Sequence, residues 1–163
     1  MGKDTKTNAM RLLDSRKLPY QEHDYSTTEA ISGTEVANVL GEDPARVFKT
    51  LVTVARSGGH YVFLVPVAEE LDLKKAAAAV GEKSIAMLKS KELLPLTGYI
   101  HGGCSPIGMK KLFPTTLHLS AQNFDTILFS GGRIGCQIEM SPDDLHKIVP
   151  FQFRDIIVSP SSR

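Results

Sequence analysis

The chain has 163 residues, which is enough for one domain with a sizeable core, so we expect a single domain over residues 1–163. Apolar residues make up 42% of it and charged residues 23%, as in soluble globular proteins, and no apolar run reaches the ~20 residues of a membrane span. The formal net charge of +1 argues against a protein that coats long nucleic acid, but allows one modest RNA-binding face.

The N-terminal quarter predicts two helices separated by a strand. Residues 6–17 have helical apolar spacing and end before Pro19. Residues 20–25 are a candidate strand. A second helix is expected over residues 33–40, with Thr34 as its N-cap and Gly41 after its last turn.

The clearest hairpin follows. Two apolar runs, at residues 47–55 and 61–67, flank a Ser-Gly-Gly turn at 57–59, and we expect both strands to be covered on both faces. Asp72 then caps a helix that runs to Ala79 and is closed by Gly81. A short helix is expected near residues 90–94.

The second half is richer in strands and loops. Residues 99–101 lead into a glycine-rich loop at 102–108, and the candidate strands after it are 116–120, 126–129, 135–140 and 154–158. Ser141 and Pro142 open a helix as N-cap and first helical residue. Strands and helices do not alternate regularly, which predicts an α+β fold: a mixed, barrel-like β-sheet surrounded by helices.

Cysteine and histidine usage predicts a reduced protein without a metal. Cys104 and Cys136 form no C-x-x-C pair, and none of the five histidines pairs with another at a metal-ligand spacing. The N-terminus lacks the apolar region of a secretory signal. We therefore expect a cytoplasmic protein with no metal, no cofactor and no membrane anchor.

Two glycine-containing loops are candidates for binding an anion or an oxyanion. The loop from Gly102 to Gly108 has three glycines in seven residues, which let the backbone approach a ligand closely and point amides at it. Ser130, Gly131 and Gly132 form a second, shorter loop. Each is also compatible with an ordinary turn between strands.

Lys49 is unusual because it lies within an apolar strand. An unpaired buried ammonium is costly, so the side chain either extends to water or holds a phosphate, hydroxyl or carbonyl oxygen at a pocket mouth. Thr50 is expected to face the other way. Cys104 is a weaker candidate, as a nucleophile paired with His101, and we expect a small buried residue instead. Cys136 is expected to be a core residue.

Four motifs in order resemble those of the YbaK/EbsC family of aminoacyl-tRNA deacylases. They are VFKTL at 47–51, LDLKK at 71–75, GGCSPIG at 102–108 followed by Lys110 and Lys111, and SGG at 130–132. The resemblance covers residues 7–157. It implies a fold similar to the editing domain of bacterial prolyl-tRNA synthetases.

The resemblance also implies the function. Members of this family remove cysteine from mischarged tRNA for proline, in a ternary complex with prolyl-tRNA synthetase. No enzyme nucleophile is implied: the thiol of the cysteinyl substrate attacks its own ester, while the protein supplies orientation and oxyanion stabilisation. The implied partners are thus aminoacyl-tRNA and prolyl-tRNA synthetase.

The resemblance implies a role in the site for ten residues of this sequence. Lys49, Gly103 and Ser105 are implied in catalysis, and the implied substrate-binding residues are Tyr25, Thr50, Gly102, Gly108, Ser130, Gly131 and Gly132. Two positions depart from the family pattern: Cys104 replaces a branched apolar residue, and Gln137 replaces an acid found in some members. Two other functions remain open: editing of alanine or serine, and a non-catalytic module that binds tRNA or the synthetase.

Overall fold

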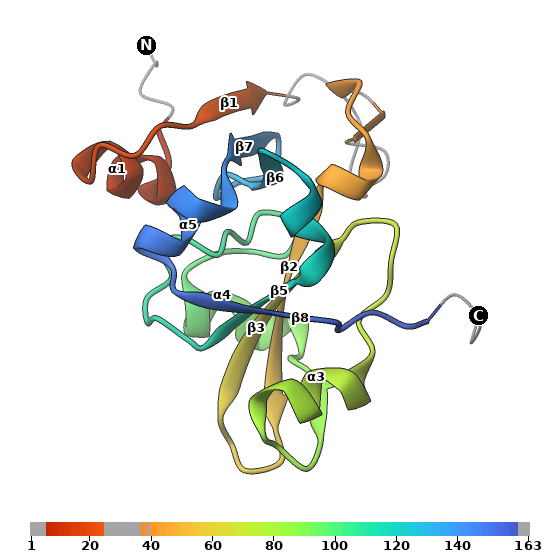
Figure 1. The fold of residues 1–163 in the computed structure, drawn as a ribbon. Helices are drawn as coiled ribbons and strands as arrows, with labels where there is room; N and C mark the ends of the chain where they lie inside the picture. Colours follow the sequence, from red (N-terminus) through yellow and green to blue (C-terminus); the bar gives the residue numbers. More distant parts are fainter. Residues whose placement is uncertain (1–5, 25–36, 39, 160–163) are drawn as a thin grey trace.

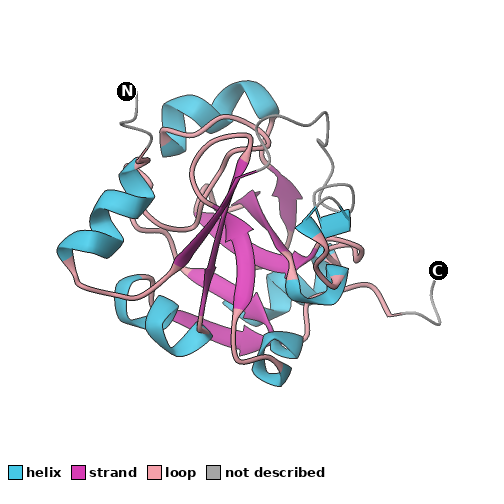
Figure 2. Ribbon diagram, turned by 90° about the horizontal axis from the view of Figure 1, so that it is seen from above, coloured by secondary structure: helices cyan, strands magenta, loops and turns pink. Residues whose placement is uncertain are grey.

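The computed structural model describes residues 6–24, 37–38 and 40–159. Within these residues the chain is α+β, as predicted, with two sheets and helices at their periphery (Figures 1 and 2). The candidate strand residue Tyr25 and the helix N-cap Thr34 lie outside the described residues.

The larger sheet has the strand order β4-β2-β3-β5-β8. Its centre is the predicted antiparallel hairpin, and β5 and β8 extend it by parallel pairing. Because this sheet combines both kinds of pairing, it is mixed, as expected. Its strands are β2 (Phe48–Ala55), β3 (His60–Pro66), β4 (Ile85–Met87), β5 (Thr115–His118) and β8 (Phe151–Arg154).

The smaller sheet is antiparallel and consists of β1 (Gln21–Asp24), β7 (Cys136–Met140) and β6 (Ile127–Ser130), in that order. A parallel bridge between Val47 and Leu128 links it to the start of β2. The two sheets are not closed into a barrel by the pairings of the described strands.

The helices begin and end at residues with recognisable cap chemistry. Asp72 accepts hydrogen bonds from two amides of the first turn of α3 (Leu73–Val80), and Gly81 ends it in a left-handed conformation. Residues 37, 38 and 40 are helical. No helix in the described part of the chain is long and apolar enough to span a bilayer. The remaining helices are α1 (Asn8–Ser15), α4 (Ser90–Thr97) and α5 (Pro142–Ile148), with 3-10 turns at Pro44–Arg46 and Leu119–Asn123.

The last predicted strand was misplaced. The strand lies at Phe151–Arg154, and not at residues 154–158, because Phe151 and Phe153 pack against the larger core while the amide of Ile156 donates to His118. Residues 99–101 are irregular rather than extended, since Tyr99 turns inward and its hydroxyl donates to the Ile107 carbonyl at 2.6 Å.

The two faces of β2 pack into different cores. Phe48 and Val52 belong to the main cluster, which also holds Leu64 of β3. Ala55 and the partly buried Leu51 belong to a second cluster with Val65. Both faces of the hairpin are therefore covered, as predicted, and side chains alternate between the two cores.

We expect His118, at the end of β5, to make the stability of the fold depend on pH. It is only 5% exposed, and Nδ1 accepts a hydrogen bond from the Ile156 amide at 3.3 Å, with Asp155 at 4.0 Å. Burial lowers the pKa of His118 below its ordinary value of 6.5, although Asp155 opposes the change. The unfolded chain therefore binds more protons near pH 6, and we expect stability to fall as the pH drops below 6.5 through the folded pKa.

Thermal unfolding of the wild type and of His118→Asn between pH 5 and 8 measures this effect. Asparagine retains an acceptor near the position of Nδ1 but does not titrate in this range. The loss of stability towards pH 5 should be smaller in the variant. An identical pH dependence in both proteins would show that His118 does not contribute.

Candidate active site

Lys49 is a half-buried cation on β2 that has no hydrogen bond or ion pair with any described residue. Burial lowers the pKa of its ammonium, and the carboxylates of Glu70 and Glu69 partly oppose this effect. An ammonium without a direct partner is available to bind an oxygen of a ligand. This environment fits the predicted role of Lys49.

The link between the two sheets places Lys49 and Ser130 on a common face. Val47 and Leu128 form the parallel bridge, and Lys49 and Ser130 each follow one of them by two residues. Side chains two residues apart in a strand lie on the same face. Thr50 therefore faces the opposite way, as predicted, towards the side of Phe48 and Leu64; its hydroxyl oxygen is buried without a hydrogen-bonding partner among the described residues.

Gln137 lies directly beside Ser130 in the smaller sheet, since the two residues are partners in the β6–β7 ladder. Its side chain is 8% exposed, and its Oε1 atom is buried without a hydrogen bond to any described group. The sequence marked Gln137 only as a departure from the family pattern. Its burial and lack of a partner are visible only in the folded chain.

Each glycine loop lies close to backbone or side chains from a distant part of the sequence. A Cβ atom on Gly103 would lie 2.9 Å from the Arg133 Cα atom, so only glycine allows this approach of the two backbones. A Cβ atom on Gly132 would lie 3.1 Å from Thr7 Cβ and 3.2 Å from the Tyr99 ring. The longer loop therefore packs against the segment that follows the shorter one, and the shorter loop packs against Thr7 and Tyr99.

Several amides of these loops are already used within the fold. Gly103 N donates to the Ile100 carbonyl at 3.0 Å, and Gly131 N donates to the Cys136 carbonyl at 2.9 Å. Gly132 N donates to the Ser130 hydroxyl at 3.2 Å. These donors are not available to a ligand in this conformation.

Other amides of the longer loop remain available. Gly102, Cys104 and Ser105 donate no backbone hydrogen bond within the described chain. The Ser105 side chain is fully buried, and its hydroxyl accepts from Ile107 N at 3.2 Å, so it shapes the loop. The carbonyl of Gly108 accepts from the Asn8 side chain at 3.0 Å.

Cys104 lacks the environment of a nucleophilic thiolate. It is buried, and burial raises its pKa to about 12. His101 is exposed, and no hydrogen bond joins it to the thiol. Cys136 is also buried, as expected for a core residue, with a pKa raised to about 11 by burial.

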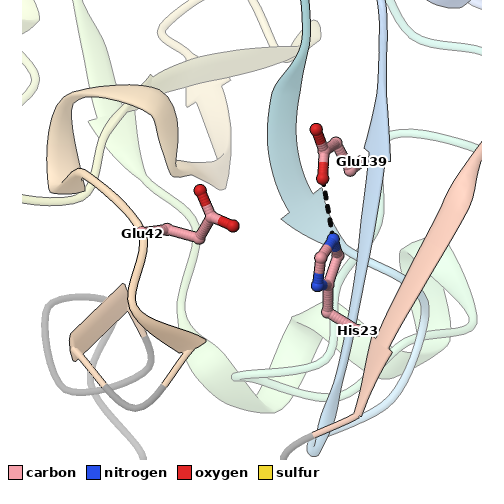
Figure 3. Close-up of side chains that lie close together, drawn as sticks. All are labelled: His23, Glu42 and Glu139. Carbon is pink, nitrogen blue, oxygen red and sulfur yellow. Dashed lines mark hydrogen bonds and ion pairs between the residues drawn. The ribbon is translucent and has the colours of Figure 1, made fainter.

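A polar cluster that the sequence did not predict joins β1, β7 and the turn before β2. His23 Nε2 lies 2.8 Å from Glu139 Oε1, and the carboxylate of Glu42 points towards this pair from the other side (Figure 3). These three residues have the ligand types of a metal site. However, Arg46 donates to both carboxylates at 2.9 Å, and it already supplies the cation that two glutamates require. We interpret the cluster as an ion-pair network.

A groove of about 240 Å³ lies between α1, α5 and the segment after the longer glycine loop. Gly108 is the one predicted site residue in its lining. Its other lining residues are Leu12, Pro106, Met109, Lys111, Leu112, Phe113, Thr115, Ile148 and Val149. Tyr25, predicted to bind substrate, lies outside the described residues.

Comparison with known proteins gives consistent matches. The sequence model of the "Aminoacyl-tRNA editing domain" family matches residues 28–148. EbsC of Enterococcus faecalis, a proposed Cys-tRNA(Pro)/Cys-tRNA(Cys) deacylase, is 47% identical over 152 residues, 93% of each chain.

Solved structures share the fold. The crystal structure of a proposed trans-editing enzyme for prolyl-tRNA synthetase matches with a TM-score of 0.81 and 26% identity, covering 96% of this chain and all of that one. The crystal structure of a hypothetical protein matches with a TM-score of 0.85 and 20% identity, covering 93% of this chain and all of that one.

Proposed function

Because the chain belongs to the aminoacyl-tRNA editing domain family, we propose that it is a deacylase that removes cysteine from mischarged Cys-tRNA(Pro). The observation that carries this proposal is 47% identity, over 93% of both chains, to a relative named for that activity. The half-buried ammonium of Lys49, which lies on the same face as Ser130 and has no direct partner among the described residues, supports it.

The substrate thiol would act as the nucleophile. Its thiolate attacks the ester carbonyl carbon and forms a carbon–sulfur bond. The bond between this carbon and the terminal ribose oxygen then breaks, so cysteine leaves as a cyclic thioester. The ribose oxygen takes up a proton and becomes a hydroxyl again. Lys49 would hold an oxygen of the ester or ribose. The amides of Gly102, Cys104 and Ser105 offer donors for the developing oxyanion.

The test is a deacylation panel with purified protein. Cys-tRNA(Pro), Cys-tRNA(Cys), Ala-tRNA(Pro) and Ser-tRNA(Pro) are compared under single-turnover conditions. Fast loss of cysteine supports the proposal, and faster loss of alanine or serine would reassign the substrate. Tight binding of tRNA without release of any amino acid would favour a non-catalytic binding module.

The partner that selects tRNA(Pro) would be prolyl-tRNA synthetase, bound with the tRNA in a ternary complex in the cytoplasm. A net charge of +1 gives the chain little general affinity for RNA, so a partner that already holds the tRNA would supply the selectivity. Adding the synthetase should raise the rate on Cys-tRNA(Pro) more than on Cys-tRNA(Cys). Equal stimulation of both substrates would contradict this role.

Cys104→Ala should retain most deacylation activity. The thiol is buried and its pKa of about 12 leaves almost no thiolate at neutral pH, so it is not a nucleophile. Single-turnover rates of wild type and variant measure this, with Cys136→Ala as the matched control. If activity disappeared in a folded Cys104→Ala protein while Cys136→Ala remained active, a covalent cysteine mechanism would replace the proposed one.

A further inference from the structure

Gln137, in the smaller sheet, has a side-chain oxygen with no hydrogen-bonding partner among the described residues. Its Oε1 atom is enclosed and accepts no hydrogen bond from the described residues, although the side chain is only 8% exposed. Leaving a buried acceptor unpaired costs free energy, so such a group is expected to gain a partner when a ligand binds.

The register shows which face Gln137 occupies. It pairs with Ser130, which shares a face with Leu128 two residues earlier. Leu128 in turn bridges Val47, which shares a face with Lys49. The Gln137 side chain therefore lies on the same side of the sheets as the ammonium of Lys49, which has no direct partner among the described residues.

Among the described residues, two other acceptors of this face already have hydrogen-bonding partners. Glu139 accepts from Arg46 and Thr126 and is paired with His23, and the Ser130 hydroxyl accepts from the Gly132 amide. An aminoacyl ester has oxygen atoms that Lys49 can bind. It also has an α-ammonium group, which the positive charge of Lys49 repels. The ammonium needs an acceptor on this face, and the side-chain oxygen of Gln137 has no hydrogen-bond donor among the described residues.

We propose that the Gln137 side-chain oxygen accepts a hydrogen bond from the α-ammonium of the bound aminoacyl group and thereby selects substrates with a free amino group. This inference rests on the proposed function for the identity of the ligand. Lys49 and Gln137 then hold opposite ends of the ester, and the amino acid is oriented between them.

Equilibrium binding tests the inference without relying on turnover. The probes are adenosine carrying an amide-linked cysteinyl group and the corresponding 3-mercaptopropionyl compound, which lacks the amino group and adds no bulk. Wild type should bind the cysteinyl probe about tenfold more tightly, as expected for a hydrogen bond to a charged group. Gln137→Met, similar in size but without an acceptor, should remove this preference and leave binding of the second probe unchanged.

Two further variants sharpen the result. Gln137→Glu presents an oxygen in either side-chain rotation and adds a charge, so it should increase the preference for the cysteinyl probe. Gln122→Met, at an exposed glutamine, is the matched control and should behave as wild type. Thermal unfolding of each variant confirms that the fold is retained.

Equal weakening of both probes by Gln137→Met, an unchanged preference, or no binding by wild type would overturn the inference. The proposed function is judged separately, by release of cysteine from Cys-tRNA(Pro). If wild type shows the preference lost in Gln137→Met but releases no cysteine, the ammonium site stands and the deacylase proposal fails.

Discussion

Cysteinyl-tRNA(Pro) should lose its amino acid far faster than seryl-tRNA(Pro), although the side chains differ by one atom. A pocket discriminates so small a difference by only ~1–3 kcal/mol. A thiol with a pKa near ~8.5 is a few per cent thiolate at neutral pH, whereas a serine hydroxyl is essentially un-ionised. Substrate-assisted attack therefore favours cysteine more strongly than binding alone can.

The same chemistry fixes the direction of the pH dependence. Because the thiolate is the attacking form, the enzymatic rate should rise with pH through the titration of the substrate thiol. The measurement is single-turnover deacylation of cysteinyl-, seryl- and alanyl-tRNA(Pro) at several pH values, corrected for spontaneous ester hydrolysis. Equal rates for cysteine and serine would rule out thiol assistance, and a preference for alanine would move the chain to another specificity within the family.

Removing the ammonium of Lys49 should lower deacylation at least tenfold while the fold survives. The structure places this cation half-buried without a partner among the described residues, so its interaction is available to substrate. One hydrogen bond involving a charged group contributes ~1.5–3 kcal/mol, which corresponds to roughly ten- to a hundredfold in rate. Single-turnover rates of Lys49→Ala and Lys49→Met measure the loss.

The two substitutions separate chemistry from packing. Methionine retains the apolar stem and removes the charge, and since burial already disfavours that charge, Lys49→Met should unfold no earlier than wild type. Lys74→Ala, at an exposed lysine of α3, is the matched control and should leave the rate unchanged. Wild-type rates in a folded Lys49→Met protein would remove Lys49 from the site.

Local patterns predicted the elements whose boundaries depend on nearby residues. The hairpin was found because both strands are apolar around a glycine turn, and α3 because Asp72 and Gly81 provide cap chemistry at its two ends. The β4 strand was missed because three residues show no periodicity of their own, and pairing with β2 defines them.

The site could be predicted only in part, because its arrangement depends on pairing between distant segments. Lys49 was recognisable as a cation in an apolar strand. The partnership of Ser130 with Gln137, and the common face that they share with Lys49, follow from the β6–β7 ladder and the Val47–Leu128 bridge. The cluster of His23, Arg46 and Glu139 likewise brings together residues with no common motif in the sequence.

The contact between Thr7 and the shorter glycine loop affects the protein during its synthesis. Thr7 Oγ1 donates to the Gly131 carbonyl at 2.5 Å, across 124 positions of the sequence. A ribosome adds ~5–20 residues per second, so the N-terminal helix waits for several seconds at least before this loop emerges. The nascent chain therefore cannot complete the loop side of the site until translation is almost finished, and an editing enzyme truncated by premature termination lacks that side altogether.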